Sequence, residues 1–218
     1  MFVVKFVFET VKEIKQSFRL MMDGAVAQSM RDKGLNYHLN WGATLPRLQA
    51  KAQEIKAMFN VSSLMFNVYD LSIALWKENV RECKILATML MPPDEILPEV
   101  VDIWQEQIPS QEIAEQLAFN LYQHLPFAAE KAYQWIASDK EYDQLCGFHV
   151  LSRLFMNGQE PNERGINEYL DEALCALQGP FPSVRKAALQ SLQRFAELGI
   201  LYERLAKSAT KSIDLDIF

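Results

Sequence analysis

The sequence predicts an all-α protein, built as a solenoid of antiparallel helix pairs. Apolar residues recur at helical spacing through most of the chain, and no period-two alternation lasts long enough to indicate a strand. Only 8 glycines and 9 prolines occur among 218 residues, and most stand between the periodic segments. Short helices that alternate with short breaks to the end of the chain are typical of stacked helix hairpins. We therefore expect residues 1–218 to form a single solenoid domain.

The first part of the chain contains predicted helices at residues 2–22 and 25–32. Gly34 is expected to end the second helix, because glycine is favoured just after a helix C-terminus. The next segment is expected to be extended or looped. Thr44 and Pro46 then supply an N-cap and a first-turn proline for a third helix. The apolar residues of that helix share one face: Leu48, Ala52, Ile55 and Phe59.

In the middle of the chain, capping residues and prolines mark the predicted helix boundaries. Two apolar-periodic stretches between residues 62 and 93 are joined near Glu78, with Asn79 as the expected N-cap of the second. Asp94 is expected to open a helix that runs through Gln105. Further helices are expected to open at Ser110, Pro126 and Asp139. The last predicted helices lie near residues 163–177, 183–198 and 201–208.

Two helix starts resemble each other and indicate a repeated unit. Residues 79–81 read Asn-Val-Arg and residues 183–185 read Ser-Val-Arg, so each combines a capping residue, a valine and an arginine. Both triplets lead into apolar helices. This weak internal similarity favours a repeat architecture.

Composition and motif content exclude several classes of protein. Cys83, Cys146 and Cys175 lie far apart among aliphatic neighbours, which favours unpaired thiols and a cytoplasmic location. No apolar run is long enough to cross a membrane. The three histidines lack metal-ligand spacing, and no phosphate-binding glycine loop or nucleophile elbow occurs. We expect no metal, no cofactor and no membrane partner.

Two segments carry a resemblance to a known family. In residues 36–48, Trp41-Gly42 and Pro46 precede a helix, and in residues 75–87, Leu75-Trp76 is followed by Arg81-Glu82 and an apolar helix. Both resemble segments of the AlkC/AlkD-type DNA alkylation repair proteins, which belong to the HEAT-like repeat DNA glycosylase superfamily. The resemblance extends over nearly the whole chain and implies a HEAT-like repeat α-α superhelix.

The resemblance also implies positions for a catalytic site. Well-studied members excise positively charged alkylated bases in an aromatic cleft that contains an aspartate and an arginine. Helix order puts Gln111 and Gln190 where tryptophans are expected, Glu115 at the aspartate and Leu145 near the arginine. Glutamine has no π-face for a cationic base, and leucine cannot hold a phosphate. Glu115 is thus the one candidate catalytic residue, and we expect excision to be weakened, altered or lost.

Charge is distributed unevenly along a chain of net charge −6. Residues 85–130 contain eight acidic residues and no lysine or arginine, whereas a face that binds duplex DNA needs clustered cations. Basic residues concentrate in the first and third predicted helices and near the C-terminus. The candidate nucleic-acid contacts are Arg47, Lys51, Arg185 and Lys186.

Three hypotheses follow for the function. The first is a DNA alkylation repair family protein that binds duplex DNA with altered or lost excision. The second is a non-enzymatic protein–protein interaction scaffold that uses an acidic concave face for a basic peptide or protein. The third is an active glycosylase with a rearranged site, which requires aromatic residues to converge on Glu115: Trp104, Tyr122, Tyr142 or Phe148.

Overall fold

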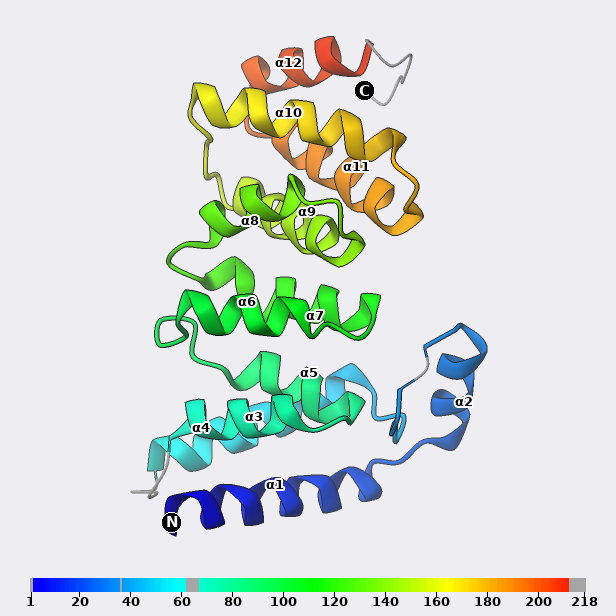
Figure 1. The fold of residues 1–218 in the computed structure, drawn as a ribbon, viewed down its shortest axis with the longest axis vertical. Coiled ribbons are helices and arrows are strands. Elements are labelled where there is room, and N and C mark those ends of the chain that lie inside the picture. Colours follow the sequence, from blue (N-terminus) through cyan, green and yellow to red (C-terminus); the bar gives the residue numbers. More distant parts are fainter. Residues whose placement is uncertain (1, 36, 62–66, 212–218) are drawn as a thin grey trace. The chain divides into compact units, whose positions relative to one another are not determined.

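The computed structural model describes residues 2–35, 37–61 and 67–211, and within these ranges the chain is helical with no strand (Figure 1). An isolated parallel bridge joins Leu39 to Val80. The chain divides into two compact units, Met1–Val101 and Asp102–Phe218, and the division falls inside α6 (Pro98–Glu106). The expectation of a single domain stays a prediction.

Unit 1 is organised around α5 (Arg81–Leu90), which is buried over almost its whole length. Both α3 (Leu45–Val61) and α4 (Val68–Lys77) pack against α5, and α1 (Phe2–Leu20) packs against α4. The predicted face of α3 is confirmed for Leu48, Ala52 and Ile55, which are buried, whereas Phe59 is half-buried. The buried residues of α1 follow helical spacing: Val7, Val11, Ile14 and Phe18.

The short helix α2 (Gly24–Asp32) shows defined signals at both ends. The Asp23 carboxylate caps its N-terminus by accepting hydrogen bonds from the backbone N–H groups of Ala25 and Val26. Gly34 follows its C-terminus with φ +84°, as the sequence predicts. Residues 37–44 form the expected loop, and residues 36 and 62–66 lie outside the described part of the chain.

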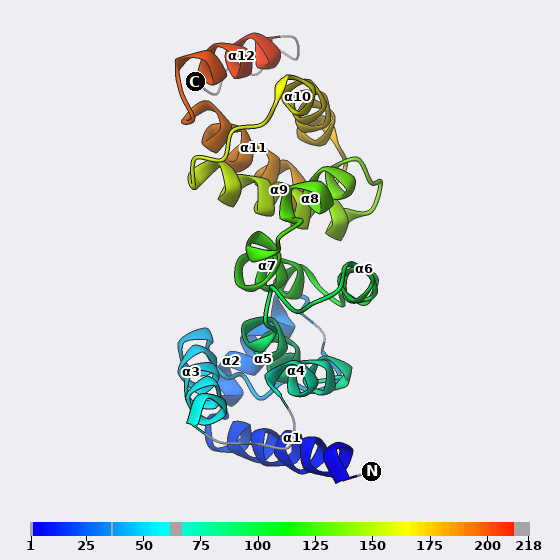
Figure 2. The ribbon, with the colours of Figure 1, turned by 90° about the vertical axis from the view of Figure 1, so that its left-hand side faces the viewer.

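Unit 2 is organised around α9 (Glu141–Met156), which packs against α7 (Gln111–Asn120), α8 (Ala128–Ile136) and α11 (Pro182–Ala196) (Figure 2). Both α10 (Glu163–Gln178) and α12 (Ile200–Lys211) pack against α11. Gly147 allows the close approach of α8, because a Cβ there would lie 2.8 Å from the Ala132 carbonyl oxygen. The turn η1 (Tyr122–His124) joins α7 to α8 and was not predicted.

Three helices of unit 2 run in the same direction and form one layer. The Ser183 hydroxyl in the first turn of α11 donates a 2.6 Å hydrogen bond to Glu141 in the first turn of α9. The backbone of Gln111, at the start of α7, faces the Tyr142 hydroxyl at the start of α9. The N-termini of α7, α9 and α11 therefore meet along one edge.

Several helices begin at residues other than those predicted. The helix expected at Asp94 begins at Pro98, because a proline disfavours helical geometry in the preceding residue and is itself suited to the first helical position. The expected N-cap Asn79 was wrong by one residue, since Val80 occupies the cap without a side-chain hydrogen bond. Ser110 is confirmed, because its hydroxyl accepts from the Ile113 N–H.

Candidate functional site

A cluster of aromatic and basic side chains lies across α7, α9 and α11 of unit 2. The ring of His149 on α9 packs edge-on against Phe119 on α7, with centroids 4.9 Å apart. The Arg153 guanidinium lies over the same Phe119 ring at 4.8 Å. Lys186 on α11 is close enough to act on the charge of His149. We call Phe119, His149, Arg153 and Lys186 the α7–α9–α11 cluster.

His149 is neutral in this cluster. Its side chain is only 9% exposed, and burial, reinforced by the positive charges of Arg153 and Lys186, lowers its pKa to about 4. A neutral imidazole can donate from one nitrogen and accept at the other. The ring therefore supports Phe119 and Arg153 without adding a third positive charge at neutral pH.

The two cations of the cluster are not neutralised by the protein. Neither Arg153 nor Lys186 forms an ion pair with any residue of the described ranges, whereas several other cations of unit 2 do. Lys186 is exposed and Arg153 is half-buried with its guanidinium on the Phe119 ring. The cluster therefore offers two positive charges without an ion-pair partner in the described ranges, one of them on an aromatic ring, which suits an anionic ligand such as a phosphate.

Glu115 lies on the same helix face as Phe119, one turn closer to the N-terminus of α7. Its carboxylate is half-buried and accepts a 2.8 Å hydrogen bond from the Gln111 side-chain amide. The position is compatible with the predicted catalytic carboxylate. No contact between Glu115 and the cluster cations is present in the described part of the chain, so Glu115 stays a prediction.

The positions that helix order assigns to the family's site residues differ in their exposure to solvent. Gln111 and Gln190 are exposed on α7 and α11, as residues of a binding face must be. Leu145 is 1% exposed and points into the core. The cation on α9 that does reach the surface is Arg153, two turns further along the helix, and the roles assigned to these positions stay predictions.

The four predicted basic contacts fall into two pairs. Arg47 and Lys51 belong to unit 1, where Arg47 donates to the Met21 carbonyl oxygen at 3.1 Å and Lys51 pairs with Glu54 at 2.9 Å. In unit 2 Arg185 donates to the Gly179 carbonyl oxygen at 2.7 Å. Only Lys186 lies in the cluster without a partner of its own, so the roles of the other three stay predictions.

Phe119, His149 and Arg153 were not predicted as functional residues. His149 and Arg153 are four residues apart on one helix, a spacing that places them on the same face. Phe119 follows Glu115 at the same spacing. This periodicity was visible in the sequence, but the proximity of α7 to α9 was not.

Of the four aromatic residues named for a rearranged excision site, three are in the core, and the fourth, Tyr142, is half-buried at the start of α9. Trp104, Tyr122 and Phe148 are at most 2% exposed, and Tyr122 packs against Trp135 with centroids 4.8 Å apart. Burial raises the pKa of Tyr122 well above its usual value. These rings cannot hold a base beside Glu115 without unpacking unit 2.

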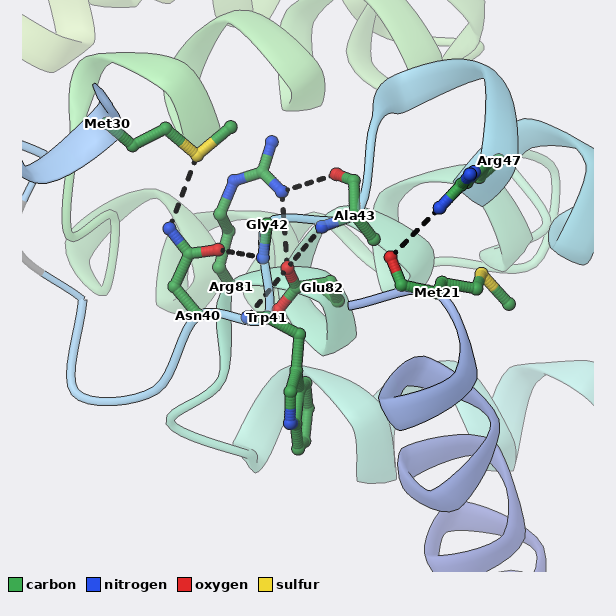
Figure 3. A network of polar contacts seen from close by, with 9 residues as sticks. All are labelled: Met21, Met30, Asn40, Trp41, Gly42, Ala43, Arg47, Arg81 and Glu82. Carbon is green, nitrogen blue, oxygen red and sulfur yellow. Dashed lines mark hydrogen bonds and ion pairs between the residues drawn. The ribbon is translucent and has the colours of Figure 1, made fainter. Parts of the chain in front are cut away.

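In unit 1, the two segments that carry the family resemblance meet in a buried polar network (Figure 3). The Glu82 carboxylate accepts hydrogen bonds from the backbone N–H groups of Trp41 and Ala43 at 3.1 and 3.2 Å. Arg81 donates to the Ala43 carbonyl oxygen at 2.9 Å and lies 3.4 Å from the same carboxylate oxygen. The Arg81–Glu82 pair thus fixes the loop before α3.

The described residues contain no group of three or more His, Cys, Asp or Glu side chains arranged to hold a metal ion. All three cysteines are unpaired thiols. Within the described ranges no helix combines the length and the apolar character that a membrane crossing requires.

Comparisons with known proteins agree with this architecture. A solved structure described as a new family of proteins related to the HEAT-like repeat DNA glycosylases, with affinity for branched DNA structures, superimposes with a TM-score of 0.76. The match covers 92% of this chain and 81% of that one at 16% identity, so it establishes the HEAT-like repeat fold. No curated protein matches the chain. The family model for the DNA alkylation repair enzyme matches residues 14–197, and the chain therefore belongs to the DNA alkylation repair enzyme family.

Proposed function

We propose that this protein binds DNA through the α7–α9–α11 cluster and does not excise alkylated bases. The observation that carries the proposal is the pair of unneutralised cations, Arg153 on the Phe119 ring and Lys186 near His149. Phosphate neutralisation by such cations supplies most of the non-specific affinity for DNA. Membership of a DNA repair family and the solved relative's affinity for branched DNA support this ligand class.

We infer the absence of excision because the α7–α9–α11 cluster lacks a free aromatic ring that could bind a cationic base. A cation over an aromatic ring gains up to about 2 kcal/mol when desolvated. Gln111 and Gln190 are the exposed residues at the positions where the resemblance implies tryptophans, and neither has a π-face. Phe119 is already covered by the Arg153 guanidinium, which would repel a positively charged base. Glu115 alone cannot hold such a base in place.

The alternative of an acidic scaffold has less support. The acidic residues of the 85–130 stretch are spread over different elements, and Glu99, Asp102 and Glu106 lie on α6. Asp102 is already paired with Lys131 at 2.5 Å. Only Glu112 and Glu115 of that stretch belong to α7. The α7–α9–α11 layer also carries Glu141 and Asp143, and these four acids are matched by four cations: Arg153, Arg185, Lys186 and Arg194.

The test is a binding titration with fluorescent linear duplex and four-way junction DNA, together with an assay for release of 7-methylguanine. We expect salt-dependent binding and no base release. The double substitution Arg153→Gln and Lys186→Gln should weaken binding by about tenfold or more at low salt, because it removes two phosphate contacts. Preference for the junction would extend the solved relative's property to this chain.

Arg164→Gln is the control for loss of a single positive charge elsewhere on unit 2. Arg164 is exposed on α10 and pairs with Glu168 at 2.7 Å, so its loss should leave DNA binding unchanged. Absence of binding at low salt would refute the DNA ligand. Release of the modified base would refute the loss of excision while leaving the binding face in place.

A further inference from the structure

A second groove, in unit 1, combines basic side chains with an aromatic ring. It has a volume of about 390 Å³ and lies between α1 and the loop that contains Leu39 and Trp41. Lys12, Lys15 and Arg19 line it from α1 at spacings of three and four residues, which places them on one helix face. The groove residues belong to unit 1 and are separate from the α7–α9–α11 cluster.

The groove is positively charged although the protein as a whole is acidic. Glu78 is the one carboxylate among its lining residues, and it is paired with Lys15 at 2.6 Å. Lys12 and Arg19 are exposed and form no ion pair within the described ranges. They are separated by seven residues, or about 10 Å along the helix axis. Two cations at that separation can contact two phosphates of one strand.

Two backbone hydrogen bonds fix the position of Trp41 in the groove wall. Its N–H donates to Glu82 at 3.1 Å, and its carbonyl oxygen accepts from the Asp23 N–H at 2.9 Å. Gly42, with φ +75°, turns the chain directly after it. Figure 3 shows the indole pointing away from the Arg81–Glu82 pair. The buried network therefore fixes the position of a ring that is itself half-exposed.

The Trp41 ring packs against Phe18 but is only half-buried, so part of it is available to a ligand. Trp41 contacts Phe18 with centroids 5.6 Å apart in a tilted arrangement. Trp76, Trp104 and Trp135 are at most 6% exposed, so Trp41 is the accessible tryptophan of the protein. An aromatic face beside unpaired cations is the combination that binds single-stranded nucleic acid, where unstacked bases expose their own faces.

We propose that the unit 1 groove binds a single strand of nucleic acid, with one base against Trp41 and its phosphates on Lys12 and Arg19. The size of the groove fits this ligand, since small-molecule sites of a few hundred Å³ hold one nucleotide-sized group. A paired duplex does not expose a base face to the ring. The site would thus take an unpaired end or gap, while the unit 2 cluster contacts backbone phosphates.

The test compares two fluorescent oligomers of equal charge, an octamer of thymidylate and an octamer of abasic residues. It uses the full chain that already carries Arg153→Gln and Lys186→Gln, so the unit 2 cluster does not contribute. We expect the thymidylate octamer to bind more tightly and to quench the tryptophan emission. Trp41→Ala should reduce its affinity by about tenfold and abolish the preference over the abasic octamer.

Lys12→Gln combined with Arg19→Gln should weaken both octamers. It should also reduce the slope of log affinity against log salt by about 1.4, since each single-strand phosphate contact contributes about 0.7. Trp41→Phe keeps an aromatic face and should retain most of the preference, which separates stacking from a folding defect. Lys56→Gln, on the exposed side of α3, is the control for loss of a single exposed positive charge outside the groove.

In the Arg153→Gln, Lys186→Gln background, equal affinity for the thymidylate octamer with and without the Lys12 and Arg19 substitutions would overturn the proposal. Equal binding of the two octamers by the folded background chain would overturn the role of Trp41. Binding of an acidic peptide but not of either octamer would reassign the groove to a protein partner. None of these results affects the duplex titration, so the two proposals fail independently.

Discussion

His149 is a base that the fold keeps uncharged, and this gives the protein a dependence on pH. Its pKa is about 4 in the folded chain and 6.5 without the fold. Between these pH values His149 binds a proton in the unfolded chain but not in the folded chain. The free energy of unfolding therefore falls as the pH drops below 6.5. Each pH unit costs about 1.4 kcal/mol, or about 3 kcal/mol over the whole window.

Urea unfolding at pH 7.5, 5.5 and 4.5 checks this prediction, with His149→Gln as the comparison. Glutamine does not titrate, so the variant should lose less stability than wild type over the same window. Equal losses in the two proteins would show that other groups cause the acid sensitivity.

Gly42 is required by both its backbone angle and its neighbours. A Cβ at this residue would lie 2.2 Å from the Asp23 carbonyl oxygen, and its φ is +75°. Gly42→Ala should therefore destabilise the protein by at least about 2 kcal/mol, from left-handed strain and displacement of the α2 cap. Gly34 has a similar φ of +84° but open space around it.

Thermal unfolding of the two alanine variants separates the effects. Gly34→Ala should show the cost of backbone conformation alone, about 1 kcal/mol. If Gly42→Ala lowers the melting temperature no more than Gly34→Ala, then the loop can move away from α2, and Trp41 is not rigidly placed.

At the scale of elements, the Arg81–Glu82 pair joins α5 to the loop before α3. Both side chains are at most 1% exposed, and Glu82 accepts from two backbone N–H groups. Glu82→Ala should cost about 3–5 kcal/mol, because it leaves a buried arginine uncompensated and two buried donors unpaired. Glu168→Ala breaks an exposed pair with Arg164 and should change stability little.

Urea denaturation of the two variants measures the contrast, and tryptophan emission reports the loop. Loss of Glu82 should shift the emission of Trp41 even where the protein remains folded. A Glu82→Ala variant as stable as Glu168→Ala would mean that the network does not hold the loop.

Helices could be predicted from the sequence where their signals are local. The apolar spacing of α3 and the Ser110 cap of α7 are local signals, and both are confirmed. The start of α6 was misplaced because an acidic residue at Asp94 suggested a cap, whereas Pro98 determines where the helix can begin. The turn η1 has no sequence signal beyond a break between two helices.

At the scale of the whole molecule, the fold and the family followed from repeated helix signals and from two short segments. The segments at residues 36–48 and 75–87 were matched separately, and the structure shows that they meet through Glu82, Trp41 and Ala43. The α7–α9–α11 cluster could not be predicted in the same way. Its three helices are brought together by packing between segments that are far apart in the sequence, and sequence spacing alone does not fix that packing.

The number of cations that contact DNA sets the expected salt dependence of binding by the whole chain. A protein of charge −6 that contacts duplex DNA mainly through Arg153 and Lys186 neutralises about two phosphates, so the slope of log affinity against log salt should be about −1.8. Affinity should then fall only about tenfold between 50 and 200 mM salt. Anisotropy titrations of duplex DNA across that range measure the slope. A slope steeper than about −5 would require several more cations at the interface, and Arg47, Lys51 and Arg185 would be the residues to substitute next.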